Sequence, residues 1–199
     1  APIMIAANPA VPAKTTRELI ALARSKPGGV SYGTPGVGSG SHLAGELMNN
    51  MAGVQLNHVP YKGTAPAVVD AIGGQINLVI TAVQNLAGHV RSGRLTPIGT
   101  TALKRTSVLP DVPAIAETLP GFEVVSAYGI LAPARTPREI VVKLNTVMGL
   151  AIISPDFKKQ FEGDGVELFG GTPEQFAERI KGYLPHYARL VQLAGIKPE

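Results

Sequence analysis

The sequence predicts an α/β fold, because short apolar runs alternate with helical segments through the first half of the chain. This rhythm favours parallel strands joined by crossover helices. With 199 residues and 45% hydrophobic side chains, the chain can bury a substantial core. After about residue 103 the rhythm changes: prolines punctuate the chain and strand patterns become scarce. We therefore divide the chain into an α/β lobe (1–124) and a mostly helical part (125–199).

Strands and helices are expected to alternate in the α/β lobe. Leu43, Leu47 and Met51 recur at helical spacing in one of these helices, and Ala65, Val68, Val69 and Ile72 do so in the next, so each has a face to bury. The expected strands are 3–8, 30–34, 56–61, 76–81 and 95–101, and the expected helices lie near 15–25, 41–52, 64–73 and 84–92.

The second part is expected to contain helices at 136–153 and 155–163, a long helix from Pro173, and short strands at 124–131 and 166–169. Capping boxes beginning at Thr15, Thr136 and Thr172 mark helix starts. An apolar stripe from Phe176 to Ala194 gives the last helix one buried face, and Pro185 is expected to kink it. Two short strands for three helices look like a sheet with pieces missing.

Composition excludes several classes of function. There is no cysteine, which rules out disulfides, thiolate metal sites and cysteine nucleophiles, and the four histidines lack metal-ligand spacing. We therefore expect neither a metal nor a cofactor. The longest apolar stretches, such as 147–153, are far shorter than the roughly 20 residues of a membrane span. No basic run exceeds Lys104-Arg105, so nucleic acid is a poor partner, whereas a net charge of +4 suits small anions.

A glycine-rich stretch at residues 31–46 is the most informative feature. It follows a strand, turns on glycines and enters a helix at Ser41 or His42. Glycines let the backbone approach a ligand closely, and the unpaired first amides of a helix, with its dipole, attract a carboxylate or phosphate. The alternative is a tight turn that binds nothing. The residues proposed to contribute amides or hydroxyls are Thr34, Gly36, Gly38, Ser39 and Ser41, with His42 able to touch a ligand, cap or pack.

A second turn at residues 59–67 repeats this arrangement. Gly63 allows the turn and Thr64 is expected to cap the next helix. Two helix N-termini after neighbouring strands converge at one edge of an open α/β sheet, where Thr81 would also lie. Lys62 either supplies a charge there or is a solvated loop residue.

Catalytic and regulatory functions are the alternatives to a binding protein. A hydrolase of the α/β class would need a nucleophile elbow, but Val37 and Ser41 stand where the Gly-x-Ser-x-Gly pattern around Ser39 requires glycine. No pair of carboxylates stands out for acid–base chemistry, so we assign no catalytic residue. An effector-binding domain of a transcription regulator would need a helix-turn-helix segment, which this sequence does not show.

Residues 33–46 and 59–67 resemble the Bug (TctC) family, the periplasmic solute-binding proteins of tripartite tricarboxylate transporters. Further matches at 109–117, 127–133 and 170–176 extend the resemblance over essentially the whole chain. It implies a two-lobed periplasmic-binding-protein fold, type II-like, that closes on its ligand by hinge motion. It also implies periplasmic capture of a small carboxylate, either a di- or tricarboxylate or an aromatic acid, for the transporter's membrane components. Family members are longer by roughly a hundred residues at the N-terminus, so residues 1–124 are expected to form the nearly complete second lobe and residues 125–199 only the C-terminal part of the first lobe.

The resemblance also implies a set of binding residues. Thr81 stands where many relatives have Asp or Asn, which argues against an amino-acid ligand. The first wall of the cleft would comprise Thr34, Gly36, Gly38, Ser39, Ser41 and His42, extended by Gly63, Thr64 and Ala65, with Ala127 and Tyr128 facing it from the other lobe.

Overall fold

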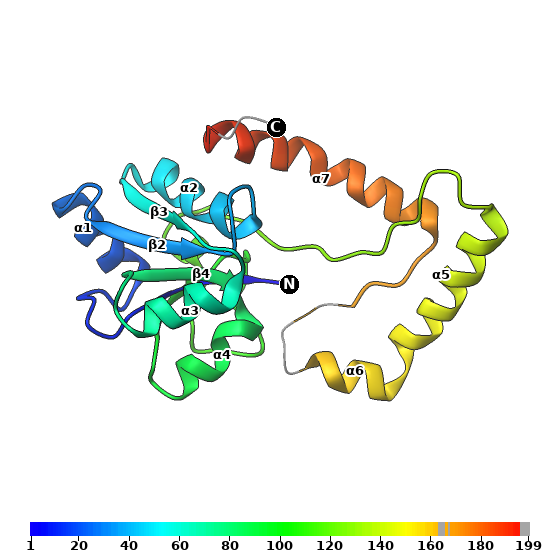
Figure 1. Cartoon of the computed structure of the whole chain (residues 1–199), viewed down its shortest axis with the longest axis horizontal. Coiled ribbons are helices and arrows are strands. Elements are labelled where there is room, and N and C mark those ends of the chain that lie inside the picture. Colours follow the sequence, from blue (N-terminus) through cyan, green and yellow to red (C-terminus); the bar gives the residue numbers. More distant parts are fainter. Residues whose placement is uncertain (163–165, 167, 196–199) are drawn as a thin grey trace.

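The computed structural model describes residues 1–162, 166 and 168–195, and its first half forms one five-stranded sheet with helices on both faces (Figure 1). All of the strands expected in the α/β lobe form, with ends that differ by no more than two residues from the expected ones. They are β1 (Ile3–Ala7), β2 (Val30–Thr34), β3 (Leu56–Pro60), β4 (Leu78–Ala82) and β5 (Thr96–Thr100). Across the sheet they lie in the order β3-β2-β4-β1-β5.

The sheet is mixed, so the expectation of parallel strands throughout is wrong. β2 runs parallel to β3 and β4, but β1 is antiparallel to both β4 and β5, with Met4 opposite Thr81 and Thr100. The cause of the error is burial. Every residue of β1 is buried, so the strand reads as a continuous apolar run that carries no sign of its direction.

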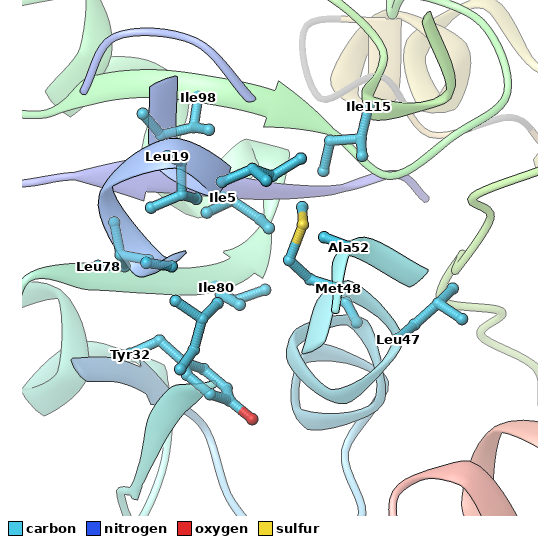
Figure 2. Packing of buried hydrophobic residues seen from close by; sticks show 14 of the residues in the cluster. Ile5, Leu19, Tyr32, Leu47, Met48, Ala52, Leu78, Ile80, Ile98 and Ile115 are labelled. Atoms are coloured by element: carbon cyan, nitrogen blue, oxygen red, sulfur yellow. The ribbon is translucent and has the colours of Figure 1, made fainter. Parts of the chain in front are cut away.

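Helices α1 (Thr16–Ser25) and α2 (Gly40–Ala52) cover one face of the sheet, and α3 (Thr64–Ile72) and α4 (Val83–Arg91) cover the other. Alternation along β1 serves both cores, because Ile5 joins the α1/α2 side and Met4 the α3/α4 side. Figure 2 shows Leu19, Tyr32 and Met48 packed in the α1/α2 core.

The buried face of α3 differs from the expected one. Ala67, Val68 and Ala71 are buried, whereas Ala65 is exposed and Val69 is 66% exposed. An apolar helix of nine residues offers more than one stripe at helical spacing, and only the packing partner selects among them.

Residues 125–195 contain α5 (Arg138–Ile153), α6 (Pro155–Glu162) and α7 (Pro173–Leu193), and a short 3-10 helix, η1 (Ile115–Glu117), precedes them. α7 runs back over α2 (Figure 1), and Leu190 is buried in the α1/α2 core beside Tyr187 and Val191. The C-terminal end of α7 therefore packs on the α/β lobe. The division at residue 124 stays a prediction.

The two strands expected in the second part do not form in the described residues. Val125 makes a single bridge with Pro2, and residues 126–131 are irregular. Val166, Leu168 and Phe169 form no strand either, and residue 167 lies outside the described range. No residue of α5 is buried, and six of its large apolar side chains are exposed, from Ile140 at 45% to Ile153 at 62%. A strand forms only where another pairs with it, and the described residues place none beside these segments.

Helix caps agree with the sequence at two of the three capping boxes. The hydroxyls of Thr15 and Thr172 accept hydrogen bonds from the amides of Glu18 and Gln175, as expected. At α5 the expectation is wrong, because Pro137 holds the N-cap position and Thr136 makes no cap.

Close contact between α2 and β2 gives a first prediction. A Cβ on Gly45 would lie 2.3 Å from the buried ring of Tyr32, so Gly45→Ala should lower the free energy of unfolding by about 1–3 kcal/mol. Gly88→Ala is the matched control, because a Cβ in the middle of α4 meets nothing within 4 Å and should stabilise by about 0.5–1 kcal/mol. Urea unfolding midpoints measure both, and equal effects of the two changes would contradict this packing.

Candidate functional site

The candidate site lies at the edge of the sheet where β2, β3 and β4 end. α2 leaves β2 on one face, whereas α3 and α4 follow β3 and β4 on the other. The connections therefore diverge between β2 and β4, which is the switch point where ligands bind in open α/β sheets. Antiparallel β1 begins at the same edge, and the carbonyl oxygen of Pro2 accepts a hydrogen bond from the amide of Val83 (3.1 Å).

Two backbone hydrogen bonds join the turns that precede α2 and α3. The amide of Gly63 donates to the carbonyl oxygen of Pro35 (3.0 Å), and the amide of Tyr61 donates to that of Thr34 (3.0 Å). The helices themselves lie on opposite faces of the sheet, but their N-terminal tips meet at its carboxyl edge. The convergence that the sequence suggested is present in the structure.

The N-terminus of α2 uses Ser39 as its cap. The Ser39 hydroxyl donates to the carbonyl oxygen of Gly36 (2.8 Å) and accepts from the amide of His42 (3.2 Å). Its one proton is therefore taken within the loop, and Ser39 supports the tip from inside. Within the described part of the chain, the amides of Gly40 and Ser41 meet no acceptor, and the hydroxyl of Ser41 has no partner although the residue is only 6% exposed.

Gly63, and not Thr64, is the N-cap of α3, so the expectation that Thr64 caps this helix is wrong. Gly63 has a φ of +112°, a backbone conformation that favours glycine. The amides of Thr64 and Ala65 begin the helix without an acceptor among the described residues, and the next residue is a proline. The Thr64 hydroxyl lies 3.3 Å from that of Thr81, which also accepts from the side-chain amide of Asn85 (3.3 Å).

The remaining predicted residues fall into two groups. Thr34 and Thr81 are buried (0% and 2% exposed), so they stand behind the tips. Ala127 and Tyr128 are exposed and follow Ser126, whose backbone exchanges hydrogen bonds with Ala1. The hydroxyl of Ser126 lies 3.5 Å from where a Cβ on the glycine at the α2 tip would sit, so this segment passes the tip. That Ala127 and Tyr128 contact a ligand stays a prediction.

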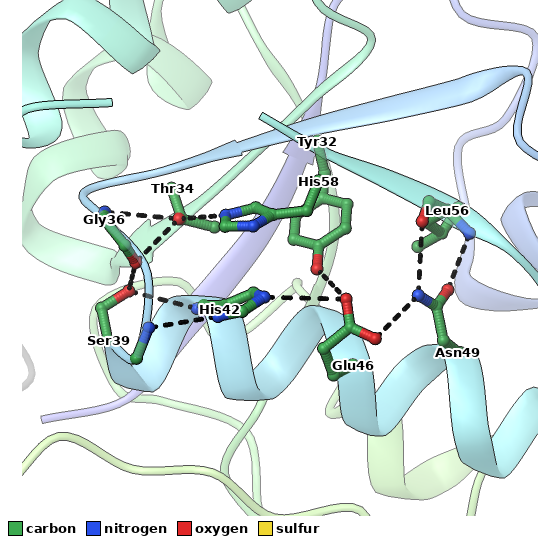
Figure 3. Close-up of polar contacts among 10 residues, drawn as sticks. Tyr32, Thr34, Gly36, Ser39, His42, Glu46, Asn49, Leu56 and His58 are labelled. Carbon is green, nitrogen blue, oxygen red and sulfur yellow. Dashed lines mark hydrogen bonds and ion pairs between the residues drawn. The ribbon is translucent and has the colours of Figure 1, made fainter. Parts of the chain in front are cut away.

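A buried polar cluster supports the α2 tip, and sequence reasoning missed most of it (Figure 3). The rings of His42 and His58 stack at 3.9 Å and 14°, and that of Tyr32 lies 5.0 Å from His58. The Tyr32 hydroxyl donates to Glu46 Oε1 (2.6 Å), which is 3.8 Å from His42 Nε2. His58 Nε2 is 2.7 Å from Thr34 Oγ1. Spacing could have suggested the pair at i and i+4 on α2, but not the side chain on β3.

Both imidazoles are held in their neutral form. Burial and, second, the neighbouring His42 together lower the pKa of His58 to about 4, while Glu46 opposes the shift. Burial also lowers the pKa of His42, whereas the nearby carboxylate of Glu46 raises it. Burial and the hydrogen bond to Glu46 raise the pKa of Tyr32. An anion at the tips would therefore meet backbone dipoles and hydroxyls, with no imidazolium charge at neutral pH.

Two further findings concern the described residues as a whole. They contain no group of three His, Asp or Glu side chains arranged to hold a metal ion. No helix among them is long and apolar enough to cross a bilayer.

The depressed pKa of His58 predicts how stability depends on pH. The unfolded chain takes up this proton near pH 6.5 and the folded chain only near 4, so between these values the unfolded state binds more protons. The free energy of unfolding should therefore decrease as the pH falls from 6.5 to about 4. Urea titrations across this range should show a shallower decrease for His58→Gln, which keeps a polar atom near Nε2, while His186→Gln on α7 should keep the parent slope.

Comparison with known proteins identifies the fold and the family. A family model described as "Tripartite tricarboxylate transporter family receptor" matches residues 1–196. A curated relative from Pseudomonas sp. (strain P51), the UPF0065 protein in the tcbD-tcbE intergenic region, is 38% identical over 176 residues, which are 87% of this chain and 52% of the relative. The chain thus spans about half the length of this relative.

Solved structures agree over nearly the whole chain. The R. palustris protein Rpa4515 with adipate has a TM-score of 0.93 at 32% identity, covering 100% of this chain and 67% of that one. The periplasmic binding protein BugD has a TM-score of 0.91 at 32% identity, with the same coverage. MatC from Rhodopseudomonas palustris with bound malate has a TM-score of 0.85 at 28% identity, covering 96% and 66%.

These matches separate a binding protein from the alternatives that the sequence left open. The matched family consists of solute-binding receptors and not of enzymes, which agrees with the absence of a nucleophile elbow at Ser39. The mixed α/β architecture, with part of the two-lobed fold present, is that of its solved members. The chain belongs to the tripartite tricarboxylate transporter receptor family, the TctC or Bug family of periplasmic solute-binding proteins.

Proposed function

We propose that this chain provides one wall of a periplasmic receptor that captures a small carboxylate, a di- or tricarboxylate or an aromatic acid, for a tripartite tricarboxylate transporter. The observation that carries the proposal is the pair of helix tips at the switch point, each with amides that have no acceptor in the described structure. Two structural neighbours are solved with adipate and with malate, and both of these ligands are carboxylates.

A carboxylate suits the donors present at the tips. It is an acceptor with about four lone-pair positions. Four backbone amides, from Gly40, Ser41, Thr64 and Ala65, and the hydroxyl of Ser41 are available to it. Two helix dipoles add favourable potential, and these donors need no reorganisation because the loops already hold them.

The chemistry of the tips disfavours an amino acid. A ligand ammonium group needs a carboxylate or several carbonyl oxygens, but position 81 is a threonine whose oxygen is already bonded to Thr64 and Asn85. Glu46 lies behind the α2 tip with its carboxylate on Tyr32, His42 and Asn49. We infer that the ligand is an acid without an amine.

The rest of the receptor follows from the family. Ala127 and Tyr128 would close over the ligand from the other lobe as the hinge moves. The periplasm as location and the transporter's membrane components as partners are part of the same proposal, since they suit a family of transporter receptors.

Calorimetric titration tests the ligand class. Adipate and malate should bind to the protein that carries this chain, whereas adipamide, the uncharged diamide of adipate, should not, because it presents no anion to the tips. Glutamate should bind more weakly than its amine-free analogue glutarate. Equal affinities for adipate and adipamide would contradict the proposed anion site.

Two hydroxyl deletions test the site. Ser41→Ala should weaken adipate binding by about tenfold or more, because a hydrogen bond to a charged group is worth about 1.5–3 kcal/mol, and Thr64→Ala should weaken it in the same direction. Ser25→Ala on α1, where an exposed hydroxyl donates to the Leu22 carbonyl oxygen, is the control and should change nothing. Unfolding midpoints close to the parent's should accompany the loss.

A further inference from the structure

The side chain of His42 makes a contact that the proposed binding role does not explain. Its Nδ1 accepts a hydrogen bond from the amide of Gly38 (3.1 Å), while its own amide donates to the Ser39 hydroxyl (3.2 Å). The loop before α2 and the first turn of the helix are thus tied together in both directions. Gly38 has a φ of +75°, so the loop holds an unusual conformation that this contact helps to keep.

The hydrogen bond from Gly38 and the stack with His58 constrain the orientation of the ring. A nitrogen that accepts a hydrogen bond carries no proton, so neutral His42 has its proton on Nε2, the atom that faces Glu46 Oε1 at 3.8 Å. His58 stacks on the ring at 3.9 Å, and its Nε2 lies 2.7 Å from Thr34 Oγ1. The backbone carbonyl of Thr34 binds the amide of Tyr61, which connects the cluster to the second turn.

From this geometry we propose that His42 is a positioning residue: its neutral ring, stacked on His58 with Nε2 toward Glu46, locks the loop at residues 36–39 through the hydrogen bond to Nδ1, and protonation of Nδ1 releases the lock. The consequence for binding rests on the proposed function, because the locked loop is what directs the amides of Gly40 and Ser41 toward the ligand. The lock itself does not depend on any ligand.

The surroundings favour the neutral ring. His42 is 7% exposed and lies in the first turn of α2, where the helix dipole opposes a positive charge. A proton on His58 would repel one on His42 across the stack, and burial lowers the pKa of both rings. The groups facing the pair are Glu46 on the same helix and Tyr32 on β2. Among the described residues, neither α7 nor α3 brings a charged side chain into contact with either ring.

Two substitutions separate the acceptor from the bulk of the ring. His42→Asn places Oδ1 near the position of Nδ1 and cannot be protonated, so the Gly38 amide resonance should stay close to its parent position and adipate affinity should fall by less than about twofold. His42→Leu fills a similar volume without an acceptor. It should shift the Gly38 resonance and weaken adipate binding by about three- to tenfold, the loss of one hydrogen bond.

Proton NMR across pH provides a readout that a purely structural role would not move. In the parent, the Gly38 amide should shift below pH 6.5 in step with the titration of the His42 imidazole, and in His42→Asn it should not shift. His186→Asn, at an exposed position of α7, should keep the parent profile. The imidazole nitrogen spectrum should show unprotonated Nδ1 above pH 6.5, and this measurement stands even if His42→Leu fails to fold.

The outcomes are distinct. A Gly38 amide indifferent to the His42 titration, an Nδ1–H tautomer at neutral pH, or a His42→Leu variant with parent Gly38 shift and parent affinity would each overturn the lock. If Gly38 follows His42 but neither adipate nor malate binds to any variant, the lock is supported and the carboxylate function alone fails.

Discussion

The arrangement of the candidate site depends on backbone amides that two neighbouring turns hold at one end of the sheet and that meet no acceptor in the described part of the chain. The hydrogen bond from Gly63 to the carbonyl oxygen of Pro35 is the direct link between these turns. It explains how helices on opposite faces of the sheet, α2 and α3, can present their N-termini together. Because β2 and β4 behind them contribute buried side chains to the two cores, the tips have a closely packed support.

Electrostatics at this edge come from dipoles more than from formal charge. The imidazoles of His42 and His58 are kept neutral by burial, and the carboxylate of Glu46 is engaged by Tyr32 behind the tip. Backbone donors of this kind hold a fixed geometry, whereas a lysine or arginine side chain would have to be immobilised on binding. The polar cluster therefore helps to hold the conformation of the loop before α2.

The second part of the chain is organised differently. α5 buries none of its side chains, and six of its large apolar residues, with those at 130 and 131, are exposed in the described structure. α7 instead packs on the α/β lobe and buries Leu190 against α2. The chain covers about two thirds of its solved relatives, so the partial lobe is consistent with the amount of the family fold that this chain spans.

Local features of the sequence were sufficient to predict the helices and strands of the α/β lobe. Periodicity located each strand and helix, the hydroxyls of Thr15 and Thr172 marked their helix starts, and the glycines at 36, 38 and 63 pointed to the turns that form the site. These signals are local, because capping, turn chemistry and amphipathic spacing act over a few residues. The family resemblance then supplied the receptor class.

Only the tertiary structure decided which partners those elements take. In the structure β1 is antiparallel to its neighbours, and residues 126–131 form no strand. Val68 and not Val69 is buried on α3, and His58 of β3 stacks on His42. The structure also showed that the proton of Ser39 is used inside the loop, whereas the Ser41 hydroxyl has no hydrogen-bond partner among the described residues. Strand direction, side-chain stacking and the use of a single proton depend on residues distant in the chain, and no local pattern records them.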